Sequence, residues 1–274
     1  MTVDPKKTRE PKRRIHHFAM LKQRSQKIVM VTAYDYPTGR AVDEGGADAV
    51  LVGDSLGMVA LGFPDTIRVT MDMMVHHAAA VRRAVKRAYL VVDMPFMSYK
   101  VSEEQAVMNA ARLVQEGGAE AVKLEGGREI APIVKKIVDS GIPVMGHIGL
   151  IPQSVHKLGG YRVQGRHEES ADSLVLDAKA LAEAGAFAVV LEAIDPTAAT
   201  EITAQAGIAT IGIGAGRGCD GQVLVISDLT GLNPDPAPKF VKKFGNAFEL
   251  MASAVREFGH EVRSGEFPKE QHEY

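Results

Sequence analysis

The chain has 274 residues, 46% of them hydrophobic and 24% charged, with a formal net charge of -2. This length permits one large domain or two small ones, and about 250 residues is typical of an α/β barrel. The near-zero charge excludes a general attraction to nucleic acid or to anionic membranes, and no apolar stretch is long enough to span a bilayer. We therefore expect small-molecule partners, with neither nucleic acid nor membrane among them.

Residues 1–24 form a basic N-terminal extension that lacks the apolar core of a secretory signal. Its basic residues include Lys6, Lys7, Arg9, Lys12, Arg13 and Arg14. A nucleic-acid-binding arm is one interpretation, but a solvated and partly disordered tail is the simpler one. The single cysteine, Cys219, cannot form an internal disulfide, which favours a reducing, cytoplasmic location.

Eight short apolar runs rich in β-branched residues alternate with segments of helical spacing, a pattern typical of buried parallel strands joined by helices. The runs are "IVMVTA" from Ile28, "DAVLV" from Asp48, "YLVVD" from Tyr89, "EAVKLE" from Glu120, "IPVMGHIG" from Ile142, "FAVVLE" from Phe187, "IATIGIG" from Ile208 and "QVLVISD" from Gln222. The phrases "DEGGADAVLV", "QEGGAEAVKL" and "AEAGAFAVVL" each end a helix with glycine directly before a strand. These units predict a single-domain α/β fold, the (β/α)₈ TIM barrel, over residues 25–262.

A C-terminal helix is expected after the proline-rich break "GLNPDPAPKF". Apolar residues recur there at helical spacing, at Phe240, Phe244, Phe248, Met251, Val255 and Phe258. We interpret this stripe as packing in the outer layer of the barrel, with a subunit contact as the alternative. Residues 263–274 are expected to form a polar tail.

Functional side chains of such a barrel lie at the C-terminal ends of its strands. Those positions hold Tyr34 and Asp35, Asp54 and Ser55, Asp93, Lys123 and Glu125, His147, Glu192, the glycines of "GIGAG", and Asp228. Asp54, Asp93 and Glu125 follow three consecutive strands. Neighbouring carboxylates repel one another unless a cation or protons intervene, and oxygen ligands suit Mg²⁺. These acids predict a metal site, although each could instead cap a following helix.

Three other strand-end residues have two interpretations each. Lys123, in an otherwise apolar strand, either pairs with an anion or the acids, or forms a Schiff base. His147 either contacts a substrate oxygen or is satisfied within the core. Glu192 ends an apolar run, which suits general base or acid work, or it pairs with a helix N-terminus. The loop "GIGAGRGCDGQ" could hold a phosphate or merely let the chain turn.

Seven phrases, taken together and in order, resemble the ketopantoate hydroxymethyltransferase family. They are "TAYD", "VGDSLGMVALG", "VKLEGG", "GHIGLIPQS", "GGYRVQGR", "VLE" and the segment from "IGIGAG" through "DGQVLV". The resemblance implies a barrel that assembles as a homodecamer and uses Mg²⁺. It also implies transfer of a hydroxymethyl group from 5,10-methylenetetrahydrofolate to 3-methyl-2-oxobutanoate, the first committed step of pantothenate synthesis.

The resemblance also assigns roles to matching positions, but none for binding folate. By this resemblance, the metal-associated acids are Asp54, Asp93 and Glu125. The residues that contact the substrate are Asp54, Ser55, Asp93, Lys123 and His147, and the proton acceptor is Glu192.

The chain departs from the family phrases at Met97, where we expect glycine, and at Arg68, where we expect proline. Neither is a proposed metal ligand or base. Two rival interpretations stay open. One is another Mg²⁺-dependent enolate lyase or mutase of the phosphoenolpyruvate mutase and isocitrate lyase type, although the context of Cys219 is unlike the cysteine loop of those enzymes. The other is a barrel that binds phosphate or flavin at "GIGAG".

Overall fold

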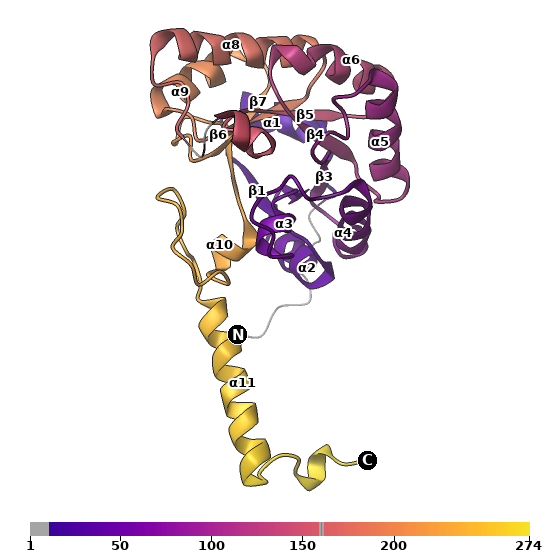
Figure 1. Ribbon diagram of the computed structural model, residues 1–274, viewed down its shortest axis with the longest axis vertical. Helices are drawn as coiled ribbons and strands as arrows, with labels where there is room; N and C mark the ends of the chain where they lie inside the picture. The colour runs from indigo at the N-terminus through magenta and orange to yellow at the C-terminus, as the bar shows by residue number, and fades with distance from the viewer. Residues whose placement is uncertain (1–10, 159, 161) are drawn as a thin grey trace. The chain divides into compact units, whose positions relative to one another are not determined.

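The computed structural model describes residues 11–158, 160 and 162–274. The chain divides into two compact units, Met1–Leu224 and Val225–Tyr274. The first contains a closed barrel of eight parallel strands in the order of the sequence (Figure 1). The strands are β1 Ile28–Thr32, β2 Ala49–Val52, β3 Tyr89–Asp93, β4 Ala121–Glu125, β5 Val144–Gly149, β6 Ala188–Glu192, β7 Ala209–Ile213 and β8 Gly221–Leu224. The predicted (β/α)₈ barrel is therefore confirmed.

Helices follow the strands and cover the outside of the barrel, as α4, α5, α6, α8 and α9 show in Figure 1. The helices are α2 Tyr36–Glu44, α3 Leu56–Val59, α4 Met71–Ala84, α5 Glu103–Gln115, α6 Ala131–Asp139, α7 Val155–Leu158, α8 Glu168–Glu183 and α9 Pro196–Gln205, with short 3₁₀ turns η1 Arg128–Ile130 and η2 Pro152–Ser154. Asp35 caps α2, because its carboxylate accepts a hydrogen bond from the Thr38 N–H at 2.8 Å. This strand-end acid is therefore a helix cap.

Helix α1, His16–Gln23, differs from the solvated tail expected for residues 1–24. Phe18 and Leu21 are buried and belong to the apolar core inside the barrel. The Phe18 ring packs edge-on against Tyr89, at the start of β3, with 5.7 Å between the ring centroids. It packs in the same way against Phe187, just before β6, with 4.9 Å between the centroids. Helix α1 thus covers the N-terminal ends of the strands and adds apolar burial there.

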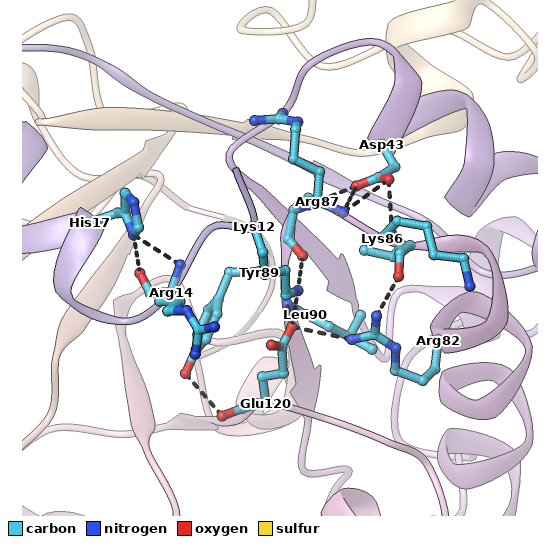
Figure 2. Close-up of polar contacts among 12 residues, drawn as sticks. Lys12, Arg14, His17, Asp43, Arg82, Lys86, Arg87, Tyr89, Leu90 and Glu120 are labelled. Atoms are coloured by element: carbon cyan, nitrogen blue, oxygen red, sulfur yellow. Dashed lines mark hydrogen bonds and ion pairs between the residues drawn. The ribbon is translucent and has the colours of Figure 1, made fainter. Parts of the chain in front are cut away.

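The basic residues around α1 are paired with acids at this N-terminal end. Lys12 Nζ lies 2.5 Å from Glu120 Oε2, and the same oxygen accepts from Arg82 and from the Leu90 N–H (Figure 2). Arg13 pairs with Asp48 at 2.9 Å, and Lys22 pairs with Asp220 at 2.8 Å. These pairs hold the segment against the barrel. Residues 1–10 of the expected extension lie outside the described residues.

The second unit contains α10 Ile226–Thr230, α11 Ala247–Ser264 and the 3₁₀ turn η3 Glu270–His272. Asp228 lies within α10, so the expectation that it ends the eighth strand is wrong; β8 stops at Leu224. No residue of α11 is buried, and its apolar stripe is available for the alternative contact with another subunit. None of the helices in the described ranges is both long and apolar enough to cross a bilayer.

Candidate active site

The pairing register of the strands brings the predicted site residues together. Asp93, the last residue of β3, is paired with Lys123 on β4, and Glu125 is paired with His147 on β5. Side chains two residues apart on a strand share a face, so Lys123 and Glu125 point the same way. Asp54 lies two residues beyond β2, and its backbone N–H donates to Asp93 Oδ2 at 3.0 Å. The acids expected from three consecutive strands therefore meet at one end of the barrel.

Lys123 lies at the centre of this group. Its Nζ is 3.1 Å from Asp93 Oδ1 and 3.1 Å from His147 Nδ1, and its side chain is 5% exposed. Burial acts to lower the pKa of Lys123, but the charges of Asp93, Glu125 and Asp54 outweigh it and raise that pKa. The amine therefore stays protonated, which favours charge pairing over a Schiff base, since a Schiff-base lysine needs a neutral amine.

The positive charge near Asp54 and Asp93 does not offset the cost of burying their carboxylates. Burial raises the pKa of Asp54 well above its usual range, and the charges of Glu125 and Asp93 raise it further. Burial also raises the pKa of Asp93, even though Lys123 opposes this. A pair of buried carboxylates that disfavour ionisation in the protein alone is the setting in which a divalent cation gains binding energy. The donor chemistry of Asp54 and Asp93 fits Mg²⁺.

Glu125 is held differently. Burial acts to raise the pKa of Glu125, but the hydrogen bond and charge of His147, together with Lys123 and a backbone N–H, lower it below its usual value. Its Oε1 lies 3.5 Å from His147 Nδ1, and its Oε2 accepts from the Gln153 N–H at 3.0 Å. Across the described part of the chain, no three His, Cys, Asp or Glu side chains could hold a metal by themselves. Mg²⁺ usually takes one or two protein carboxylates and completes its coordination with water and substrate.

His147 connects the lysine and acids to Glu192. Its Nε2 lies 3.2 Å from Glu192 Oε2. Burial and the charge of Lys123 act to lower the pKa of His147, but the hydrogen bonds to Glu125 and Glu192 raise it to about 9. A neutral ring that accepts from Lys123 at Nδ1 has its proton on Nε2, and a charged ring has protons on both nitrogens. In either state, Nε2 carries a proton beside Glu192.

Glu192, the last residue of β6, is 18% exposed at its side chain and is the most open acid of this group. Gly149 on β5, with φ +95°, is its register partner. A Cβ at Gly149 would lie 2.4 Å from the Glu192 carbonyl oxygen. Ala193, the next residue along the chain, has φ +47°, a left-handed conformation uncommon outside glycine. The backbone of β5 at Gly149 thus lies close against the backbone of Glu192.

The structure adds three residues that the sequence did not assign to the site. Tyr34 shares a 2.9 Å hydrogen bond between its hydroxyl and Ser55 Oγ, so it orients that serine. Gln153 and Tyr99 are buried beside Asp54 and Glu125. Tyr34 is at a strand end and Gln153 is in "GHIGLIPQS", so both were within recognised phrases. Neither residue type carries charge, however, and nothing in the local pattern singled them out.

The "GIGAG" loop has a packing explanation. Gly216, at φ +80°, lies where a Cβ would be 2.8 Å from the Pro196 side chain, and its carbonyl accepts from Gln222 Nε2 at 2.9 Å. Cys219 is buried and free in the same loop.

Met97, which replaces an expected glycine, has φ +61° and so occupies a backbone conformation that glycine adopts readily.

Comparison with known proteins identifies the family. The model of the family described as ketopantoate hydroxymethyltransferase matches residues 12–270. The chain belongs to this family. It is 54% identical over 254 residues to 3-methyl-2-oxobutanoate hydroxymethyltransferase of Carboxydothermus hydrogenoformans, covering 93% of this chain and 92% of that protein. It is 59% identical over 245 residues to the protein of the same name from Ignicoccus hospitalis, covering 89% of this chain and 92% of that protein. The chain is therefore an enzyme of the hydroxymethyltransferase class.

Solved structures share the fold at low sequence identity. A phosphonopyruvate hydrolase in complex with oxalate and Mg²⁺ matches with a TM-score of 0.60 and 12% identity, covering 92% of this chain and 87% of that chain. A 2,3-dimethylmalate lyase of the phosphoenolpyruvate mutase and isocitrate lyase superfamily matches with a TM-score of 0.59 and 15% identity. The match covers 94% of this chain and 91% of that chain. These similarities concern the barrel alone.

The close approach at Gly149 generates a prediction. We expect Gly149→Ala to lower kcat by about 100-fold, because the new methyl group displaces Glu192 and misplacement of a catalytic group by about 1 Å costs that much. The matched control is Gly141→Ala, which has a similar φ of +89° but no atom within 4 Å of the new Cβ. Steady-state kinetics and thermal denaturation of both variants make the test. Equal kcat values in the two variants would contradict the role assigned to Gly149.

Proposed function

We propose that this enzyme transfers a hydroxymethyl group from 5,10-methylenetetrahydrofolate to 3-methyl-2-oxobutanoate and forms 2-dehydropantoate, the first committed step of pantothenate synthesis. The observation that carries this proposal is the position of Glu192, 3.2 Å from His147 Nε2. It lies beside buried acids whose negative charge the nearby cations do not offset. A carboxylate base next to a cation site suits removal of a proton next to a carbonyl group. A cytoplasmic location stays a prediction.

Asp54 and Asp93 are the residues that would hold Mg²⁺, with Glu125 beside them as a further acid. When bound, Mg²⁺ would stabilise the negative charge that develops on the keto oxygen of the oxo acid. Lys123 neutralises part of the charge of these acids and adds attraction for the substrate carboxylate. Ser55, oriented by the Tyr34 hydroxyl, donates a hydrogen bond to the substrate.

Glu192 removes the proton from C3 of the oxo acid, and C3 then forms a carbon–carbon bond to the one-carbon unit of the folate. Both bonds from that carbon to the two folate nitrogens break, and water supplies the hydroxyl oxygen. The proton taken from C3 and one proton of the water end on those nitrogens, and tetrahydrofolate leaves. His147 lies between the base and the other acids, with its Nε2 3.2 Å from Glu192 Oε2. By the resemblance, His147 is also a polar group near the new hydroxymethyl group.

The reaction itself tests the proposal. Purified enzyme with both substrates and Mg²⁺ is expected to form 2-dehydropantoate, and a chelator is expected to stop it. Asp54→Asn should lower kcat/KM by at least about 100-fold while the thermal midpoint stays the same or rises, because the substitution removes a buried charge that repels its neighbours. The control is Asp139→Asn, which removes an exposed partner of Lys135 on α6.

Absence of product from the wild-type enzyme with Mg²⁺ would refute the transferase proposal. Undiminished turnover with chelator would refute the role of the metal.

We also propose that the enzyme forms a homo-oligomer, with the apolar stripe of α11 in the interface. The stripe includes Phe248, Met251, Val255, Phe258 and Val262, all exposed. Exposed apolar surface of this kind is typical of an interaction site. The resemblance suggests a homodecamer.

The mass in solution tests this assembly. Val255→Glu, which places a charge in the stripe, should lower the mass measured by light scattering. Ser253→Glu, on another side of the same helix, should leave the mass unchanged. A wild-type enzyme with the mass of one chain would contradict the proposal.

A further inference from the structure

Gln153 is a buried residue that connects several parts of the active site. It lies in the turn η2, between β5 and α7, and is 3% exposed. Its side-chain Nε2 donates to Asp54 Oδ2 at 2.9 Å and to the Met94 carbonyl at 2.9 Å. Its backbone N–H donates to Glu125 Oε2 at 3.0 Å. One residue thus touches the segments that follow β2 and β3 and the last residue of β4.

The orientation of the Gln153 amide follows from its partners. Asp54 Oδ2 and the Met94 carbonyl are both acceptors, so the side facing them must be the NH₂ group. The opposite side, Oε1, lies 3.0 Å from the Tyr99 hydroxyl. That hydroxyl also contacts the backbone of Glu125, at 2.8 Å from the carbonyl oxygen and 3.1 Å from the nitrogen. A flipped amide would place oxygen against oxygen at two contacts.

These contacts fix the geometry of both acids. With Oδ2 of Asp54 held by the amide, rotation of that carboxylate breaks a buried hydrogen bond. With Oε2 of Glu125 held by the backbone N–H, Glu125 stays directed at His147. Outer partners of this kind orient metal-binding carboxylates, and their mutation typically costs about 10- to 100-fold in metal affinity.

We propose that Gln153 is a positioning residue: its amide holds one oxygen of Asp54 so that the other is presented to the cation in a fixed direction. This inference rests on the proposed function, because it assumes that Asp54 binds the metal. It goes beyond the family resemblance in assigning the role to the segment after β5, where the resemblance assigns no metal ligand.

The test measures Mn²⁺ affinity, a property separate from turnover. Free Mn²⁺ is followed by electron paramagnetic resonance during titration of the purified enzyme without substrates. Gln153→Met keeps the length of the side chain and the backbone N–H but removes the amide. We expect its dissociation constant for Mn²⁺ to rise by about 10- to 100-fold. The Mg²⁺ concentration for half-maximal rate should rise by a similar factor.

Two further variants separate positioning from folding. Gln153→Asn keeps an amide but withdraws it by one methylene group, so it should lose affinity as the methionine variant does. Gln105→Met, the control, removes the amide of a half-buried glutamine on α5 and should bind Mn²⁺ as the wild type does. All proteins are compared as folded material after size-exclusion chromatography.

Wild-type affinity in either folded Gln153 variant would overturn the positioning role and leave the proposed function intact. Failure of both Gln153 variants to fold would also overturn it, since the amide would then be structural. Failure of the wild type to bind Mn²⁺ would instead count against the proposed metal site, and the inference would fall with it.

Discussion

The rest of the active site depends on the buried ammonium group of Lys123. It contacts Asp93 and His147 inside a group that also contains Asp54, Glu125 and Glu192. Four carboxylates thus share one lysine and one histidine. Removing one partner of a buried ion pair costs about 3–5 kcal/mol, because the other charge is left uncompensated. Even with Lys123 in place, the acids retain an excess of negative charge. We propose that this excess attracts a cation beside Glu192, the proposed base.

The two ends of the barrel differ in how their charges are balanced. At the N-terminal end, Lys12, Arg13 and Lys22 neutralise acids that begin or precede strands, and α1 completes the apolar core. At the C-terminal end, acids outnumber their partners. This division is typical of the fold, in which residues at the N-terminal end contribute to stability and residues at the C-terminal end contribute to catalysis. It also explains why a net charge of -2 says so little about the function of this chain.

The barrel could be predicted from the sequence because apolar runs alternate with segments of helical spacing. The charged residues of the site could be predicted because each stands at or near the end of an apolar run. Buried parallel strands read as apolar runs, and a charge at the end of such a run has few structural explanations. Gln153 could not be found in this way, since it lies in a short turn and its role comes from contacts with residues 54, 94 and 125. Helix α1 was misread because the basic residues that precede it, Lys12, Arg13 and Arg14, outnumber its two buried side chains, Phe18 and Leu21. Asp228 was misplaced because the apolar run continues past the end of β8 at Leu224 into α10.

Exchange of the C3 proton of 3-methyl-2-oxobutanoate tests the central claim most directly, namely that Glu192 removes this proton beside a cation-requiring cluster of acids. The proton is followed by NMR in D₂O, with folate present to complete the site, for the wild type and for Glu192→Gln. The account predicts Mg²⁺-dependent loss of the C3 signal in the wild type. It predicts no loss in Glu192→Gln, although that variant should bind Mn²⁺ as tightly as the wild type. Exchange at the wild-type rate in Glu192→Gln would contradict the account, because another group would then remove the proton.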